Sequence, residues 1–194
     1  MMKRVCVFCG SNRGVRPAYT AAAEKLARFL VKLGIGIVYG GGNIGLMGVL
    51  ADTAIMAGGE VTGVIPEALF AKEVGHAGVA NMRIVGSMHE RKALMAELSD
   101  GFIALPGGWG TFDEFCEILT WAQLGLHRKP CGILNVEGYY DPLLRMFDHS
   151  VAEGFLKPEY RLLVIAASEP EELLAKMQSY RAPSLDRWIE ESQT

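Results

Sequence analysis

Several features that define other classes of protein are scarce in this chain. Only four of its 194 residues are cysteine and four are histidine, and the formal net charge is −3 without a basic stripe. The lack of net positive charge argues against nucleic acid as the main partner. No apolar run approaches the roughly 18 residues that span a bilayer, and the first residues lack the long apolar segment of a signal peptide. We therefore expect a cytoplasmic protein that has no membrane partner.

The cysteines and histidines lack the spacing of a redox or metal site. Cys6 and Cys9 form a CxxC inside the strand-like run Val5–Cys9, whereas a redox CxxC lies at a helix start, where the thiolate is stabilised. Cys116 and Cys131 are too far apart to complete a zinc ribbon. The histidines show no ligand spacing either. The sequence predicts buried, reduced thiols that pack as small hydrophobic groups, and no metal.

Half of the residues are hydrophobic, and their spacing alternates between strand and helix patterns. The expected strands are 3–9, 35–39, 60–65, 82–85, 101–105, 131–135 and 162–166. The expected helices are 17–33, 46–57, 87–98, one after Thr111 that runs to 124, 140–153 and 170–180. Such alternation implies a parallel sheet covered on both faces. We predict an α/β fold with a doubly wound, mainly parallel sheet in a single domain, residues 1–180, followed by a loosely held C-terminal tail, residues 181–194.

The stretch Leu105–Glu114 (LPGGWGTFDE) is the main candidate for a site. It follows an apolar strand and precedes apolar residues at helical spacing, so it is a glycine turn from a strand into a helix. Such a turn presents unpaired backbone N–H groups and the positive end of a helix dipole, which suits a phosphate. We expect the carboxylate of Glu114 in the first helical turn, beside that anion site. The pattern favours chemistry on a nucleotide or a sugar phosphate.

A structural role for the same residues competes with this interpretation. Thr111-x-x-Glu114 also fits a capping box, in which the glutamate only secures the helix start. Three glycines in the turn, at 107, 108 and 110, favour a site instead, because glycine lets a ligand approach the backbone. The spacing leaves both interpretations open.

A second glycine turn, residues 40–48, follows the expected strand 35–39. Gly40-x-Gly42-x-x-Gly45 satisfies the dinucleotide fingerprint, but a single match is weak. The fingerprint also needs an acidic residue at the end of the next strand, which here reads Val64-Ile65-Pro66. NAD or FAD is therefore disfavoured. Either the glycines allow helix and strand to pack closely, or Gly41 and Gly42 form the second wall of a mononucleotide site.

The glycine turns lie where a site is expected in this fold. They follow Cys9, Tyr39 and Leu105, each at the end of a predicted strand. Ligands of open α/β sheets bind beyond the carboxyl ends of the strands, where the strand order reverses. The sequence therefore gathers its unusual residues at one edge of the sheet.

Two motifs resemble those of a known family. Pro106-Gly107-Gly108-x-Gly110-Thr111-x-x-Glu114 matches the PGGxGTxxE signature of the LOG ("Lonely Guy") nucleotide phosphoribohydrolases, and Met88-x-x-Arg91-Lys92 matches their MxxRK signature. The resemblance extends from Val5 to about Ala166. It implies a modified Rossmann fold and hydrolysis of the N-glycosidic bond of a nucleoside 5′-monophosphate, either a cytokinin riboside 5′-monophosphate or AMP. The products would be the free base and ribose 5-phosphate, and no metal or organic cofactor would be needed.

The resemblance also implies roles for individual residues. Arg91 and Glu114 match the catalytic pair. A carboxylate can stabilise the oxocarbenium-like transition state and position the attacking water, and arginine can clamp phosphate or ribose oxygens. Without the resemblance, Arg91-Lys92 would be interpreted as a solvated helix pair. With the two glycines of the second turn added, the expected substrate-binding residues are Glu73, Met88, Lys92, Gly108, Trp109, Gly110, Thr111, Phe112, Asp113, Thr120, Gly41 and Gly42.

Other functions remain possible at the level of the residues. The same cradle could serve a non-catalytic nucleotide carrier, as in the related molybdenum-cofactor carrier proteins, although a carrier does not need Arg91 with Glu114. The family's older label is lysine decarboxylase, but nothing in this sequence resembles the pyridoxal-phosphate lysine site that such an enzyme needs. The resemblance further implies a homodimer, with the helices after Ser87 and Thr111 as candidates for the interface. The residues leave open which base is preferred and whether Trp109 faces it.

Overall fold

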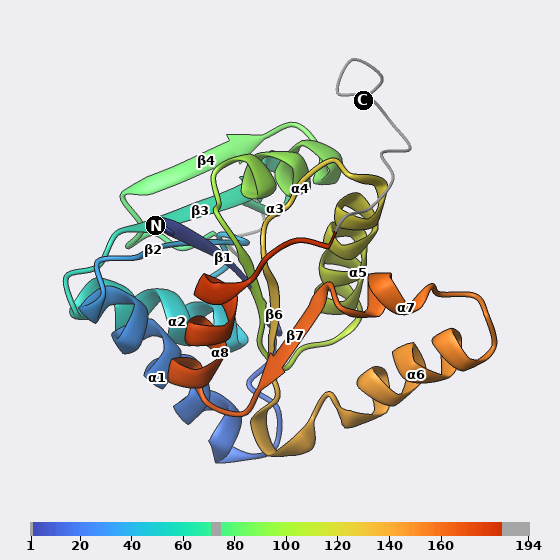
Figure 1. Ribbon diagram of the computed structural model, residues 1–194. Helices are drawn as coiled ribbons and strands as arrows, with labels where there is room; N and C mark the ends of the chain where they lie inside the picture. Colours follow the sequence, from blue (N-terminus) through green and yellow to red (C-terminus); the bar gives the residue numbers. More distant parts are fainter. Residues whose placement is uncertain (1, 71–74, 184–194) are drawn as a thin grey trace.

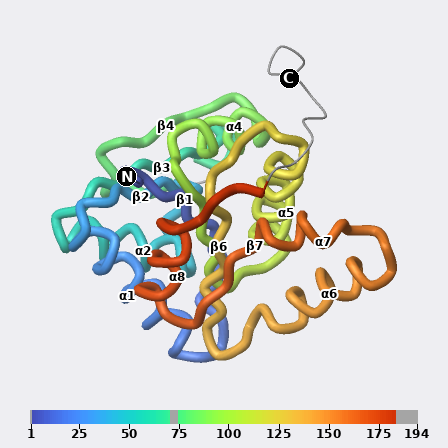
Figure 2. The backbone as a smooth tube through the Cα atoms, in the orientation of Figure 1, coloured from blue at the N-terminus to red at the C-terminus, as the bar shows by residue number. Residues whose placement is uncertain are grey.

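The structure, a computed structural model, describes residues 2–70 and 75–183. A seven-stranded sheet has the order β4-β3-β2-β1-β5-β6-β7, and all of its pairings are parallel. Figure 2 shows the chain passing from β1 near the centre out to β4 and then back across to β6 and β7, and β5 pairs between β1 and β6. The strands are β1 Arg4–Phe8, β2 Gly36–Tyr39, β3 Val61–Pro66, β4 Asn81–Val85, β5 Phe102–Ala104, β6 Cys131–Leu134 and β7 Val164–Ala167.

Helices cover both faces of the sheet (Figure 1). One hydrophobic cluster joins the sheet to α1, α2 and α8, and a second cluster on the opposite face joins it to α4, α5 and the beginning of α6. The helical segments are α1 Pro17–Lys32, α2 Gly45–Met56, α3 Glu67–Leu69, α4 Met88–Glu97, α5 Trp109–Leu124, the 3-10 turn η2 Val136–Gly138, α6 Asp141–Ala152, α7 Pro158–Arg161 and α8 Pro170–Ser179.

The strand sequences explain this arrangement. Strands β2, β3, β5 and β6 are buried at every residue, as expected for parallel strands with helices on both sides. The edge strand β4 is largely exposed, and its sequence carries an asparagine and an arginine. These interior strands are therefore mostly apolar, whereas the edge strand β4 carries polar residues.

The strand order reverses between β1 and β5, because β2 to β4 lie on one side of β1 and β5 to β7 on the other. The loops that follow β1 and β5 meet there, and the N–H of Gly10 donates to the carbonyl of Pro106 at 3.0 Å. A cavity of about 260 Å³ opens between these loops, with Tyr19 and Leu46 in its wall. This is the crevice in which ligands of open α/β sheets bind.

The prediction of an α/β fold with a doubly wound parallel sheet and helices on both faces is confirmed. The segments α3, η2 and α7 were not predicted, and β7 begins at Val164 rather than at residue 162. The end of the predicted tail, residues 184–194, lies outside the described residues. In the part of the chain that the structure describes, no helix is long and apolar enough to cross a membrane.

Candidate active site

The start of α5 has the geometry of an anion cradle. Gly108 is the N-cap and provides no side-chain cap. Among the described residues, the backbone N–H groups of residues 107–111 have no hydrogen-bond partner. A Cβ atom added at Gly108 or Gly110 would meet no heavy atom within 4 Å, so space is open on that side of the turn. These unpaired donors, at the positive end of a 16-residue helix, form the kind of site that binds phosphate.

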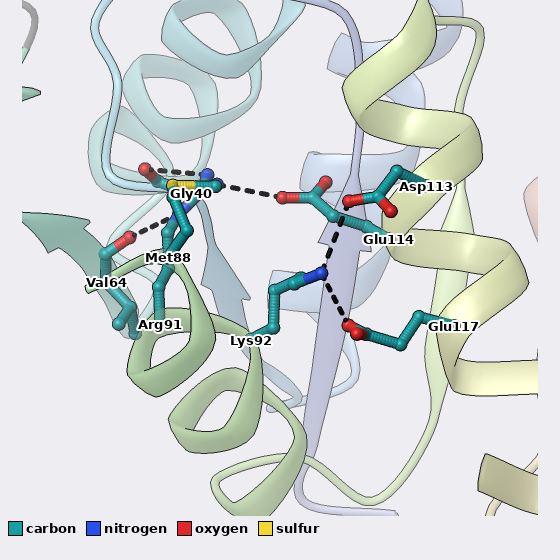
Figure 3. Close-up of polar contacts among 8 residues, drawn as sticks. All are labelled: Gly40, Val64, Met88, Arg91, Lys92, Asp113, Glu114 and Glu117. Atoms are coloured by element: carbon teal, nitrogen blue, oxygen red, sulfur yellow. Dashed lines mark hydrogen bonds and ion pairs between the residues drawn. The ribbon is translucent and has the colours of Figure 1, made fainter.

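The capping-box interpretation of Thr111 and Glu114 is wrong. The helix starts at Trp109, so Thr111 is its third residue and Glu114 its sixth, in the second turn rather than the first. The glycine at 108 lets the chain enter the helix three residues earlier than a threonine cap at 111 would. The carboxylate of Glu114 therefore takes no part in capping, and it points toward α4 instead (Figure 3).

Glu114 forms a buried ion pair with Arg91. Its Oε1 lies 2.9 Å from Nη1 of Arg91, and each side chain is only 10% exposed. Burial raises the pKa of Glu114 above the ordinary carboxyl value, and the charge of Arg91 opposes that rise. Ser87 caps the start of α4 and helps to hold Arg91 in place, since its Oγ accepts the N–H of Glu90 at 3.1 Å. The site thus holds a carboxylate that takes up a proton more readily than an exposed one.

The guanidinium of Arg91 also binds the ends of two strands. Its Nε donates to the carbonyl of Val64 at 3.1 Å, and its Nη2 donates to the carbonyl of Gly40 at 3.2 Å. The sulfur of Met88 lies 4.0 Å from Nη1. Three of the five guanidinium N–H groups are thus engaged by protein oxygens, which leaves two for the methionine sulfur or a substrate. Arg91 is therefore buried and is not the solvated surface residue that spacing alone would indicate.

The second glycine turn makes room for this arginine. A Cβ atom at Gly40 would lie 2.0 Å from Nη2 of Arg91, so a larger residue would displace the guanidinium. Gly41 has φ +75°, and its carbonyl accepts the N–H of His76 at 2.9 Å. Gly42 forms an isolated antiparallel bridge with Gly75. Close packing against Arg91 thus accounts for Gly40, and Gly41 and Gly42 follow it in the same turn.

Lys92 follows Arg91 on α4, and its side chain reaches α5. Its Nζ forms ion pairs with Glu117 and Asp113 (Figure 3). The distances are 2.9 Å to Glu117 Oε2 and 3.3 Å to Asp113 Oδ2. Burial works against its charge, but the two carboxylates outweigh burial and raise its pKa. The side chain is only 14% exposed, so Lys92 joins α4 to α5 beside the catalytic candidates.

The other predicted residues are spread along α5. Thr111 is buried against the glycine turn, whereas Trp109 is 89% exposed and packs edge to face on Phe112. Thr120 lies nine residues, or about 13 Å, beyond Thr111. Its hydroxyl donates within the helix to the carbonyl of Cys116 at 2.8 Å, so it is not brought to the cradle in this chain. Glu73 lies outside the described residues.

Two residues beside the cradle were missed from the sequence. The hydroxyl of Tyr139 donates to the carbonyl of Gly107, and the hydroxyl of Tyr140 donates to the carbonyl of Leu105 at 2.7 Å. They follow β6, more than 30 residues from the glycine motif, so no local pattern connects them to it. A pair of adjacent tyrosines in the segment after β6 was the only available signal.

Among the described residues, no group of three or more histidine, cysteine, aspartate or glutamate side chains could hold a metal ion. All four cysteines are free thiols. Burial raises the pKa of Cys9 and Cys131, so these thiols are neutral at physiological pH. The prediction of buried, reduced cysteines is confirmed for Cys6, Cys9 and Cys131, while Cys116 is half-buried.

Taken together, fold and site define a Rossmann-like α/β protein with an anion cradle at a helix start and a buried arginine–glutamate ion pair beside it. A family profile described as "Possible lysine decarboxylase" matches residues 47–177. The chain is 54% identical over 177 residues to the probable cytokinin riboside 5′-monophosphate phosphoribohydrolase LOGL1 of Oryza sativa subsp. japonica, which covers 91% of this chain and 79% of that protein. It is also 47% identical over 184 residues to the cytokinin riboside 5′-monophosphate phosphoribohydrolase LOG7 of Arabidopsis thaliana. That alignment covers 95% of this chain and 84% of LOG7. The chain belongs to this LOG family, as its two signatures predict.

More distant solved structures share the fold. The molybdenum cofactor binding protein of Rippkaea orientalis is 22% identical, with a TM-score of 0.69 over 92% of this chain and 97% of that one. The molybdenum cofactor carrier protein of Chlamydomonas reinhardtii is 20% identical, with a TM-score of 0.67 over 92% and 97%. At this level of identity the similarity concerns the fold alone.

Proposed function

We propose that this protein hydrolyses the N-glycosidic bond of nucleoside 5′-monophosphates to the free base and ribose 5-phosphate. The observation that carries the proposal is the buried carboxylate of Glu114, paired with Arg91 and placed on the same helix as the anion cradle. Cytokinin riboside 5′-monophosphates and AMP are the expected substrates. The names of the LOG relatives support this activity over a carrier function.

The geometry suits the reaction. The substrate phosphate would accept hydrogen bonds from the N–H groups at the start of α5, with the hydroxyl of Thr111 nearby. From Trp109 to Glu114 the helix rises about 7.5 Å, which is on the scale of one ribose phosphate. The carboxylate would then lie near the sugar, where it stabilises the developing positive charge and positions or deprotonates the attacking water.

The surrounding residues prepare Glu114 for this role. Arg91 favours the ionised carboxylate and fixes its direction, because the guanidinium is itself held by two strand ends. The raised pKa of Glu114 makes it a stronger base than an exposed carboxylate. Lys92 adds a second cation to this region through its ion pairs with α5. The protein's part in the chemistry is thus to hold the phosphate and to place one prepared carboxylate.

The test is incubation of the purified protein with AMP and with N6-isopentenyl AMP, followed by chromatography of the free base. Adenosine and ATP serve as substrate controls. The decisive variant is Glu114→Gln, which keeps the shape of the side chain and removes its basicity. The matched control is Glu97→Gln, which changes an exposed carboxylate on α4. We expect base release from monophosphates only, lost in Glu114→Gln and unchanged in Glu97→Gln.

Binding measurements separate the alternatives. Glu114→Gln should still bind AMP, because the cradle donors are backbone groups. An equal loss of binding and turnover would instead give Glu114 a structural role. If no monophosphate releases base while nucleotide still binds, the hydrolase proposal fails and a carrier function takes its place.

A homodimer and a cytoplasmic location are part of the same proposal. The groove between α4 and α5, about 540 Å³, exposes an apolar wall that includes Ala93, Trp121 and Leu126. Helix α6 has no fully buried residue and projects from the body (Figure 1), and Met146 and Phe155 are exposed there. These surfaces support a second copy as partner. Sedimentation equilibrium should give twice the mass of the chain, and the free thiols fit a reducing compartment.

A further inference from the structure

Every carbonyl group in the turn of residues 105–108 is bonded away from the cradle. The carbonyl of Pro106 accepts from the N–H of Gly10, and that of Gly108 accepts from Phe112 inside the helix at 3.1 Å. The two remaining carbonyls, of Leu105 and Gly107, accept from the hydroxyls of Tyr140 and Tyr139. The turn therefore presents N–H groups on one side, because its carbonyl oxygens are engaged on the other.

The direction of each carbonyl fixes the direction of one amide. The described residues contain no cis peptide bond. In a trans peptide unit the C=O of one residue and the N–H of the next point in opposite directions. The Tyr139 hydroxyl, by holding the carbonyl of Gly107, thus sets the direction of the Gly108 N–H, a donor of the cradle. Tyr140 differs, because the carbonyl of Leu105 shares its peptide unit with Pro106, which has no N–H.

The surrounding structure holds Tyr139 firmly. Its ring packs edge to face between the rings of Tyr19 and Tyr140, with centroid distances of 5.6 and 5.1 Å. The turn before it contains Glu137 at φ +48°, an uncommon conformation for a residue other than glycine. Glu137 is tied to α1 by an ion pair of 3.0 Å with Arg16. A strained, anchored turn that delivers one side chain is typical of a functional position.

We propose that Tyr139 is a positioning residue for phosphate binding, acting through the carbonyl of Gly107. It lies in the wall of the switch-point cavity, next to Gly107 and Gly108. Without its hydroxyl, the Gly107–Gly108 peptide unit loses its external bond and is free to turn its carbonyl toward the bound anion. The inference rests on the proposed function, because it assigns the cradle to the substrate phosphate.

The test compares Tyr139→Phe with Tyr140→Phe. Each variant keeps its ring and loses one hydroxyl that bonds to a carbonyl of the same turn, so Tyr140→Phe is a matched control for lost stability. For Tyr139→Phe we expect KM for AMP and Kd for ribose 5-phosphate to rise about five- to tenfold, the usual effect of one lost hydrogen bond. We expect kcat within about twofold of wild type, since Glu114 and Arg91 are untouched. For Tyr140→Phe we expect a lower Tm with unchanged KM and Kd.

Calorimetry with ribose 5-phosphate keeps this inference separate from the proposed function. If the wild type binds ribose 5-phosphate but hydrolyses no nucleotide, the hydrolase proposal fails, and a weaker Kd in Tyr139→Phe alone still supports the positioning role. If both variants bind as the wild type does, the positioning role is refuted. It is also refuted if the two variants lose affinity equally, because general destabilisation then explains the effect.

Discussion

Replacing Arg91 with methionine should cost stability in a pH-dependent way. Methionine fills most of the same volume, but it gives up the ion pair with Glu114 and the hydrogen bonds to the carbonyls of Val64 and Gly40. The two lost hydrogen bonds should each cost about 1–3 kcal/mol at every pH, since the carbonyls remain buried. The lost ion pair should cost a further amount, about 3–5 kcal/mol for a buried pair. This second cost arises only at a pH where Glu114 is ionised in the unfolded chain, because the folded variant must then bury the charge unpaired or take up a proton.

The sign of the pH dependence follows from the raised pKa of Glu114. A carboxyl group whose pKa is higher in the folded than in the unfolded state adds no cost below the unfolded value of about 4.3. The cost grows as the pH rises from there to the folded pKa, and it is then constant. Removal of the guanidinium raises the folded pKa further and widens this window. Arg91→Met should therefore lose about 3 kcal/mol more at pH 7.5 than at pH 4.5.

Urea unfolding at several pH values isolates the part of the loss that depends on Glu114. Arg91→Met is measured in the wild-type background and in the Glu114→Gln background. The double variant lacks the carboxylate, so it should keep only the pH-independent loss. The wild type measured at each pH corrects for the other titrating groups. A loss in Arg91→Met that is equal at pH 4.5 and pH 7.5, within about 0.5 kcal/mol, would refute the reasoning.

Four further variants test other features of the structure. Gly107→Ala should lower the free energy of unfolding by about 1–3 kcal/mol, because its Cβ would lie 2.0 Å from the Thr111 hydroxyl. Gly108→Ala, whose Cβ has open space, should fold normally in urea titrations and raise KM for AMP. Burial lowers the pKa of His127 to about 4. The folded protein should therefore become less stable as the pH drops from about 6.5 toward 4. Urea titrations at pH 7 and pH 4.5 should show this loss reduced by up to about 3 kcal/mol in His127→Gln. Ser87→Ala should cost about 1 kcal/mol in the same assay through loss of the N-cap, and an unchanged value would mean that the cap is dispensable.

The sequence predicted the sheet and the cradle because both depend on local signals. Buried parallel strands appear in the sequence as short apolar runs, and a glycine turn after such a run indicates that a helix follows. The position of that start was harder to predict. Thr111 carries the usual capping signal, but Gly108 already turns the chain into α5, and Glu114 is thereby released to pair with α4.

The environment of Arg91 could not be predicted from its own neighbourhood. Arg91-Lys92 on a polar helix has the pattern of a solvated face, yet Arg91 is buried because Gly40 leaves room and Val64 supplies a carbonyl. Val64 lies 27 residues before Arg91, and Gly40 lies 51 residues before it. Tyr139 escaped notice for the same reason, since its partner Gly107 lies 32 residues earlier. Only the family signature selected Arg91, and no signature included Tyr139.

The location of the Arg91–Glu114 pair has a consequence for how the chain acquires its activity during folding. Arg91 is fastened to the ends of β2 and β3, whereas Glu114 belongs to the helix that follows β5. In the folded sheet these two parts are joined through the pairing of β1 with β5, a contact between residues as distant as Cys6 and Phe102. Pairing across such a separation closes a long loop and forms slowly. On refolding, helical signal should therefore return before the ion pair does, and catalytic competence marks the completion of the central sheet.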